Sequence, residues 1–187
     1  PRANSQRQLT FFTIVYTGWI QNIFTAKGKA MRLDGSCHCG AVRFSVEADA
    51  PYPFNLCYCS ICRKTAGTGG FAINLGAQTD TLKIEGEEYI RVYRAIMEDG
   101  SRSSAERRFC GECGSALWLW SPQWPELMHP HAGAIDTPLP VPPERTHLLL
   151  NSKPDWVMFH PADRDRCFVN FPDESLADWH QRLGLGA

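Results

Sequence analysis

The sequence lacks an excess of charge of either sign. Its 187 residues carry 19 Lys and Arg against 20 Asp and Glu, a formal net charge of −1. Because sites for polyanions neutralise phosphates with clustered basic side chains, this balance argues against nucleic acid as a partner. The sequence also contains no glycine-rich phosphate loop and no serine nucleophile elbow, which argues against the nucleotide-binding and hydrolase classes that these motifs define.

A long apolar run is missing as well. The uncharged stretch over residues 8–26 includes four threonines together with Gln21 and Asn22. It is too polar for a membrane span, which needs about 20 mostly apolar residues. Residues 1–30 hold four basic residues and no acid, so a targeting peptide is one interpretation. Because Met31 has the appearance of a natural start, we favour an N-terminal extension outside the fold and a single domain over residues 31–187.

Cysteine, in contrast, is plentiful. Seven of the eight cysteines form a C-x-C, a C-x-C-x-x-C and a C-x-x-C motif, with Cys167 alone near the end. Thiols spaced so closely suit chelation of one ion better than long-range disulfide cross-links, and zinc is the metal that such clusters most often hold. Thiolate ligands also imply a reducing compartment, so we expect a cytoplasmic protein.

The seven clustered cysteines divide into four and three. The knuckle of Cys110 and Cys113 needs two further ligands, and the simplest pairing supplies them from Cys37 and Cys39. Four thiolates make a closed site, which stabilises the fold rather than performing chemistry. His38 lies between two of these ligands and is expected to face away, since neighbours on an extended strand point to opposite faces.

The remaining three cysteines, Cys57, Cys59 and Cys62, form a group with one zinc position vacant. Three protein ligands with an open fourth position are typical of catalytic zinc, and the vacancy can hold water or a substrate thiolate. Alternatively a further residue completes the tetrahedron. The candidates are Cys167, His129, His131 and His160. Cys167 is also interpretable as a small buried hydrophobe.

Other side chains near these motifs are weaker candidates. Arg63 and Lys64 follow the three-cysteine group directly and could bind a substrate carboxylate or lower a thiolate pKa. His129 and His131 could act as acid and base, but we place them on a Pro-rich loop without a partner. Three tryptophans are expected mainly in the core. They are Trp118, Trp120 and Trp124.

The remaining pattern is mostly β. Alternating apolar residues predict strands over residues 41–46, 81–84, 89–93, 116–120, 147–150 and 156–159. Four prolines between residues 138 and 143 predict a loop. One helix is predicted near the C-terminus, over residues 174–183, with Asp173 as its N-cap.

These motifs resemble the glutathione-dependent formaldehyde-activating enzyme family, which includes the centromere protein V type of domain. The resemblance rests on residues 35–42 (GSCHCGAV), 57–64 (CYCSICRK) and 108–115 (RFCGECGS), with support from residues 133–136 and 152–156. It covers residues 32–172 and implies a β-tent fold of several small coiled antiparallel sheets organised around zinc. It also implies two zinc ions per chain, in the same four-plus-three division.

The resemblance further implies an activity, a carbon–sulfur lyase reaction run in reverse. In that reaction the thiol of glutathione adds to formaldehyde, giving S-hydroxymethylglutathione. The partners would be glutathione or another small thiol and a small aldehyde, with no nucleic acid and no membrane, and Cys57, Cys59 and Cys62 would be the catalytic group. Two rival functions remain open: a non-catalytic zinc module that binds a protein, and a zinc protein whose three-cysteine group responds to oxidation.

Overall fold

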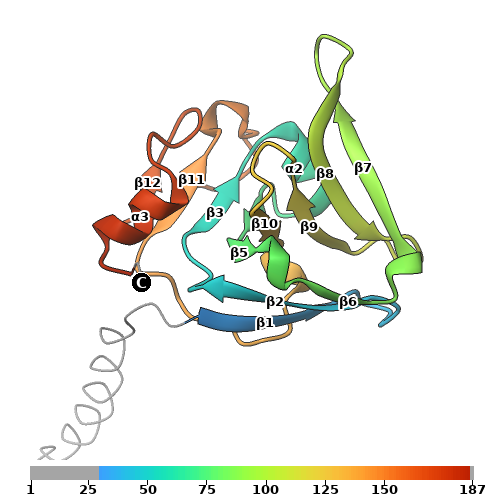
Figure 1. The fold of residues 1–187 in the computed structure, drawn as a ribbon. Helices are drawn as coiled ribbons and strands as arrows, with labels where there is room; N and C mark the ends of the chain where they lie inside the picture. The colour runs from blue at the N-terminus through green and yellow to red at the C-terminus, as the bar shows by residue number, and fades with distance from the viewer. Residues whose placement is uncertain (1–29, 186–187) are drawn as a thin grey trace, which may run out of the picture.

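The computed structural model describes residues 30–185 (Figure 1). The segment expected to be an N-terminal extension, residues 1–30, lies outside that range except for Ala30, the first residue of strand β1. Within the described residues the protein is mainly β, with three small sheets and two short α-helices. No helix in this part of the chain has the length and apolar character needed to cross a bilayer.

The first sheet is antiparallel and lies beneath the other two in Figure 1. It consists of β1 (Ala30–Ser36), β2 (Arg43–Asp49) and β6 (Lys83–Glu85). Phe44, Val46 and Ala48 alternate along β2 and are buried, as the period-2 pattern predicts. The Phe44 ring packs on Trp118 of the second sheet at 5.1 Å between ring centroids, so the main core lies between these two sheets.

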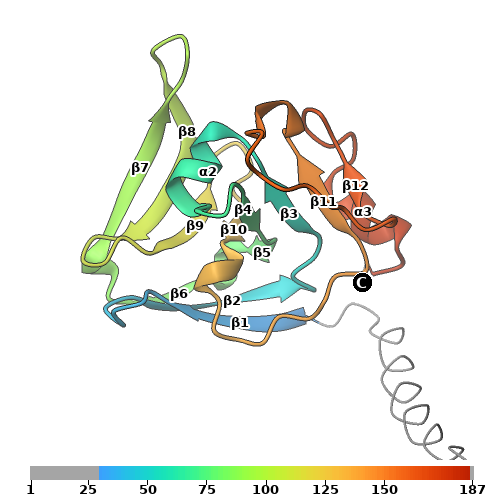
Figure 2. The same cartoon turned by 180° about the vertical axis from the view of Figure 1, so that it is seen from behind.

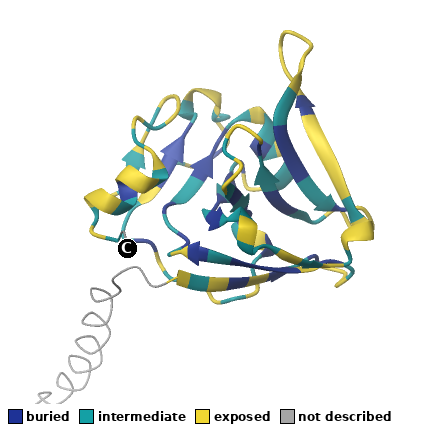
Figure 3. Ribbon diagram, in the orientation of Figure 1, coloured by how far each residue is buried: buried dark blue, intermediate teal, exposed yellow. Residues whose placement is uncertain are grey.

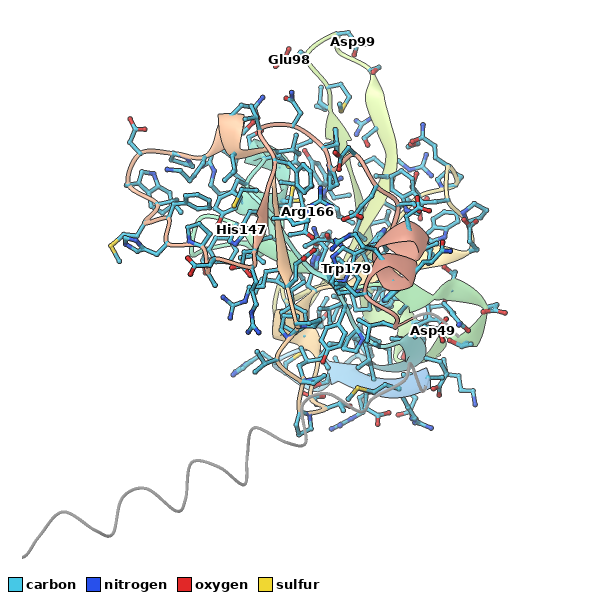
Figure 4. All side chains as sticks on the ribbon, turned by 90° about the vertical axis from the view of Figure 1, so that its left-hand side faces the viewer. Asp49, Glu98, Asp99, His147, Arg166 and Trp179 are labelled. Carbon is cyan, nitrogen blue, oxygen red and sulfur yellow. The ribbon has the colours of Figure 1, made fainter. Side chains whose placement is uncertain are left out.

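The second sheet is also antiparallel and has five strands in the order β5-β10-β9-β8-β7. They are β5 (Ala77–Gln78), β10 (Leu127–Pro130), β9 (Ala116–Trp120), β8 (Arg102–Cys110) and β7 (Ile90–Ile96). The strand predicted over residues 116–120 coincides with β9. Strand β7 is the edge and is largely exposed (Figure 3), and the tip of its hairpin with β8 carries Glu98 and Asp99 away from the body of the protein (Figure 4).

The third sheet, in the order β12-β11-β3-β4, is mixed. It contains β12 (Arg166–Cys167), β11 (Arg145–Leu148), β3 (Phe54–Cys57) and β4 (Ala72–Asn74). Strand β11 runs parallel to both β3 and β12, whereas we expected antiparallel pairs. A parallel neighbour needs a long crossover, and here all five strands of the second sheet lie in the chain between β3 and β11. Figure 2 shows this sheet and the second sheet rising from the first on opposite sides, the tent-like arrangement that the family resemblance implies.

Two helices complete the described structure. The helix α2 (Ser60–Ala66) was not predicted, because its seven residues are too few for a clear 3.6-residue period. The C-terminal helix was predicted, but α3 (Leu176–Arg182) begins two residues later than expected. Its N-cap is Ser175 rather than Asp173. The Ser175 hydroxyl accepts from the Asp178 amide, and the Asp178 carboxylate accepts in return from the Ser175 amide, a complete capping box.

One predicted strand is wrong. Residues 156–159 alternate in burial as a strand would, with Trp156 and Met158 exposed and Val157 buried, yet they pair with no strand among the described residues. The backbone instead turns, and the Val157 amide donates to Pro154 O at 3.1 Å. Two other predictions are shifted: β11 ends at Leu148 because Leu149 is left-handed (φ 60°), and Thr79–Thr81 forms a 3-10 turn before β6.

Candidate metal centres and the adjacent pocket

Four cysteines from two hairpins meet at one point. Cys37 and Cys39 lie in the turn between β1 and β2, whereas Cys110 ends β8 and Cys113 lies in the turn that leads to β9. Their four sulfurs all lie within 4.8 Å of one another, with 3.4 Å from Cys37 Sγ to Cys39 Sγ and 3.8 Å from Cys39 Sγ to Cys110 Sγ. Four sulfurs about 2.3 Å from a tetrahedral zinc would lie about 3.8 Å apart, so this donor set fits zinc.

Local backbone geometry positions these sulfurs. Gly40 and Gly114 adopt left-handed conformations (φ +77° and +76°), and their amides donate to Cys37 O at 3.0 Å and Cys110 O at 2.9 Å. The two turns are also joined directly, since the His38 amide donates to Ser115 Oγ at 3.0 Å. The His38 side chain is exposed and does not belong to the cluster, as predicted, although it lies in the turn between β1 and β2 and not on a strand. These contacts hold the donor set together.

The second cluster, which we call the trio, consists of Cys57, Cys59 and Cys62, again with sulfurs within 4.8 Å of one another. Cys57 is the last residue of β3, and the other two belong to the start of α2. Cys59 is the N-cap, and its sulfur accepts a hydrogen bond from the Cys62 amide at 3.3 Å. Helix α2, which the sequence did not predict, therefore turns Cys59 and Cys62 back toward Cys57.

Among residues 30–185, no fourth His, Cys, Asp or Glu belongs to the trio. Cys167, the first alternative, lies exposed on β12 and is not the buried hydrophobe of our other interpretation. His129, His131 and His160 also lie outside the cluster. The trio thus offers three protein donors, as a metal site with one open position requires.

The three thiols do not titrate independently. Hydrogen bonds from the Cys57 and Cys62 thiols lower the pKa of Cys59 to about 2, although burial acts in the opposite direction. The hydrogen bond to Cys59 raises the pKa of Cys57 far above the ordinary thiol value, and burial adds to this rise. One thiolate is therefore available at neutral pH, and a cation that bound there would displace the other two protons.

A second hydrogen-bonded group, which consists of Tyr58, His147 and Asp165, lies next to the trio's strand β3. The Tyr58 hydroxyl lies 2.9 Å from His147 Nδ1, and His147 Nε2 lies 3.4 Å from a carboxylate oxygen of Asp165. Tyr58 lies between Cys57 and Cys59 in the sequence, and its side chain is buried. Its amide donates to Leu148 O at 3.1 Å. Figure 4 shows His147 beside Arg166 of the neighbouring strand. These contacts fix β3 against β11 and so hold the trio's first ligand in place.

A pocket of about 390 Å³ lies between α2 and the second sheet, and no cysteine of the trio is among its lining residues. Thr65, one turn after Cys62 on α2, lines one wall, and residues of β8 and β9 line the other. The remaining lining residues are Tyr93, Arg107, Arg108, Phe109, Gly114, Ala116 and His131. Its volume is within the range of small-molecule sites, about 300 to 1,000 Å³.

The two histidines that we placed on a Pro-rich loop lie instead at the end of β10. His131 is buried on the pocket wall, and its Nδ1 lies 3.0 Å from Asn74 Oδ1, an acceptor, so Nδ1 carries the proton and Nε2 does not. Burial lowers the pKa of His131 to about 4, and the positive charge of Arg107 acts in the same direction. His129 donates to Leu75 O at 2.9 Å and does not line the pocket.

The basic residues near the trio separate into two groups. Arg63 and Lys64, the expected carboxylate binders, do not line this pocket, whereas Arg107, which the sequence reading missed, does. The charge of Arg107 also reaches the trio. A hydrogen bond from Cys57 lowers the pKa of Cys62, but the Cys59 thiolate and burial together outweigh it, so the pKa of Cys62 is raised overall. The positive charge of Arg107 opposes this rise. No motif marks Arg107; the only sequence signal is its place two residues before Phe109-Cys110.

Comparison with known proteins finds a matching family model, a close relative and a solved structure. A family model described as glutathione-dependent formaldehyde-activating enzyme matches residues 32–151, a range that includes all seven clustered cysteines. A Halomonas elongata protein provisionally named a glutathione-dependent formaldehyde-activating enzyme is 61% identical over 155 residues, which are 83% of this chain and 98% of that protein. The crystal structure of a Rhodobacter sphaeroides protein is 28% identical, with a TM-score of 0.46, over 59% of this chain and 92% of that one. On the family match and the close relative, the chain belongs to the glutathione-dependent formaldehyde-activating enzyme family.

Proposed function

We propose that the protein is a zinc enzyme that adds the thiol of glutathione to formaldehyde or a related small aldehyde, giving S-hydroxymethylglutathione. The observation that carries the proposal is the trio, which offers three sulfur donors and no fourth among residues 30–185. The pocket of about 390 Å³, lined by Thr65 one turn after Cys62, supports it with space for a substrate. A closed structural zinc would be held by Cys37, Cys39, Cys110 and Cys113, and a catalytic zinc by Cys57, Cys59 and Cys62.

The reaction balances without an oxidant or a reductant. One carbon–sulfur bond forms, the carbonyl π electrons move to the aldehyde oxygen, and the proton lost by the thiol ends on that oxygen. Zinc bound by the trio would supply a positive centre that keeps a fourth thiol as thiolate at neutral pH. Because three thiolates already give such a site a formal charge of −1, its role is to hold the thiol more than to polarise the aldehyde.

The chain's own residues contribute the surroundings of that step. Tyr93 and Phe109 line the pocket and give it apolar walls. His131 is unprotonated at neutral pH, and its Nε2 is free to accept a hydrogen bond from the hydroxyl of the product. The Asn74 amide oxygen fixes this tautomer from the other side of the ring.

The pocket favours this function over one of its two rivals, the module that binds a protein. A module that only binds another protein would be favoured by an exposed apolar patch without a pocket at the trio. The pocket is present, and it supports a small-molecule reaction. The eight cysteines are all free thiols, in keeping with the proposed cytoplasmic location.

The test combines zinc content, thiol binding and turnover. Protein purified under reducing conditions should carry two zinc ions per chain, bind glutathione in a calorimeter, and form S-hydroxymethylglutathione faster than the spontaneous reaction, as measured by NMR exchange. A Cys59→Ser variant should keep one zinc and lose both binding and catalysis, because the trio loses a ligand. Cys167→Ser is the matched control, since this exposed cysteine lies outside both clusters. One zinc in the wild type, or two zincs without thiol binding, would contradict the proposal.

A further inference from the structure

Arg107 and its neighbour Glu106 on β8 are equally buried, but Glu106 has ion-pair partners and Arg107 does not. Side chains alternate between the two faces of a strand, and Glu106 and Arg108 share one face, where their carboxylate and guanidinium pair at 2.6 Å. Arg94 of β7 pairs with the same carboxylate. Arg107 points to the opposite face, and only 9% of its surface is exposed.

Among residues 30–185, no carboxylate pairs with the Arg107 guanidinium. Its Nη1 is buried without a hydrogen-bond partner in this part of the chain. An arginine keeps its charge at all accessible pH values, and a buried charge without a partner is costly. His131, which lines the same pocket, is neutral, and Arg108, which also lines it, is already paired with Glu106. The Arg107 guanidinium therefore keeps a donor that an entering anion can use.

Resting on the proposed function, we propose that Arg107 binds a carboxylate of the thiol substrate and so selects carboxylate-bearing thiols such as glutathione over neutral ones. The planar guanidinium fork matches the two oxygens of a carboxylate. Arg107 lines the same pocket as Thr65, which stands one turn from Cys62. A thiol whose sulfur meets the trio can thus extend its anionic end along the pocket to Arg107.

A carboxylate suits Arg107 better than the aldehyde does. Formaldehyde is uncharged and small, and it needs neither a permanent cation nor a pocket of about 390 Å³. With zinc bound, three thiolates would give the trio a formal charge of −1, which would repel an anionic thiol. A fixed positive charge on the pocket wall offsets that repulsion and makes the anionic form the preferred ligand.

The experiment measures affinity rather than turnover. Zinc-loaded full-length protein is titrated in a calorimeter with glutathione, with its diester and with 2-mercaptoethanol. Arg107→Gln should weaken glutathione binding about 10- to 100-fold, the effect of losing a hydrogen bond to a charged group. The affinity for the diester and for 2-mercaptoethanol should change less than about 3-fold, because these thiols present no carboxylate to a guanidinium. Arg107→Lys should recover part of the loss, since it restores the charge without the fork.

Arg94→Gln is the matched control, because it removes one positive charge from the neighbouring strand outside the pocket and should leave all three affinities unchanged. Equal loss for charged and neutral thiols, or no loss, would overturn the proposal. If Arg107→Gln does not fold, the wild type decides: the proposal fails if the diester binds as tightly as glutathione. The proposed function has a separate test. If glutathione binds through Arg107 but is not turned over with formaldehyde, only the proposed function is refuted.

Discussion

His131 shows how a single residue's surroundings set its chemistry. In the sequence it is one of two histidines near prolines, with nothing to distinguish an acid from a base. In the structure it is buried, it donates from Nδ1 to Asn74, and its pKa falls to about 4. The residue that could have been a proton donor at neutral pH is therefore a fixed acceptor on the pocket wall.

This burial predicts a loss of stability in acid. The unfolded chain binds a proton at the ordinary histidine pKa of about 6.5, whereas the folded chain binds it only near 4, so stability is full above pH 6.5 and falls as the pH drops toward 4. Between pH 7 and pH 5 the loss from this group is about 2 kcal/mol. Urea unfolding at both pH values should show that His131→Gln loses less stability than the wild type. The exposed His160→Gln should behave as the wild type does, and equal losses in all three proteins would contradict the prediction.

Arg107 illustrates a residue that sequence reading could not find. The run Glu106-Arg107-Arg108 has the appearance of an exposed charged strand, and strand alternation alone does not say which face is solvated. Its inward face is decided by the pairing of β8 with β7 and β9, which aligns Arg107 with Tyr93 and Leu119. The expected carboxylate binders, Arg63 and Lys64, were chosen because they adjoin the trio in the chain, and adjacency in sequence did not bring them to the pocket.

At the scale of elements, the two helices are short and depend on their caps. α2 starts with a cysteine that serves at once as helix cap and as proposed metal ligand. α3 is held by its capping box and by Trp179, whose indole donates to Glu144 at 2.8 Å, a carboxylate that also pairs with Arg182. Figure 4 shows Trp179 on this helix. Helices of seven residues are not stable alone, so these contacts decide whether they form.

The capping box gives a prediction that separates the two candidate N-caps of α3. Ser175→Ala should cost about 1 kcal/mol, because the Asp178 amide loses its acceptor. Asp173→Ala should cost at most a few tenths of a kcal/mol, because its carboxylate is exposed and pairs only with Arg166, at 3.3 Å. Chemical denaturation of the two variants measures the difference. A larger effect at Asp173 would show that the helix begins earlier, as the sequence pattern suggested.

At the scale of the whole molecule, the two clusters join different parts of the chain. The four-cysteine cluster connects the hairpin of β1 and β2 with that of β8 and β9, across 71 residues between Cys39 and Cys110. The trio lies within six consecutive residues and joins only the end of β3 to the start of α2. Loss of the first should therefore affect the fold, and loss of the second should affect the site.

This difference gives a prediction with opposite outcomes for two cysteines. A structural zinc contributes about 10 to 16 kcal/mol of binding free energy, which rivals the whole stability of a domain. Cys110→Ser should therefore lose near-UV circular dichroism and its cooperative thermal transition. Cys59→Ser should keep both, with a Tm within about 5 °C of the wild type. Equal unfolding of the two variants would mean that the structural and catalytic assignments are wrong.

The sequence by itself determined the family, the predominance of β structure and the four-plus-three division of the cysteines, because ligand types and spacings are local properties of the chain. It could not determine that residues 156–159 form no strand, because a strand needs a partner and that partner is chosen by the tertiary fold. Nor could it place Arg107 and His131 in the lining of one pocket, since these residues are distant in the sequence. The ligands of the proposed metal sites can thus be identified from short sequence motifs. The residues that surround the proposed substrate depend on how the sheets pack together.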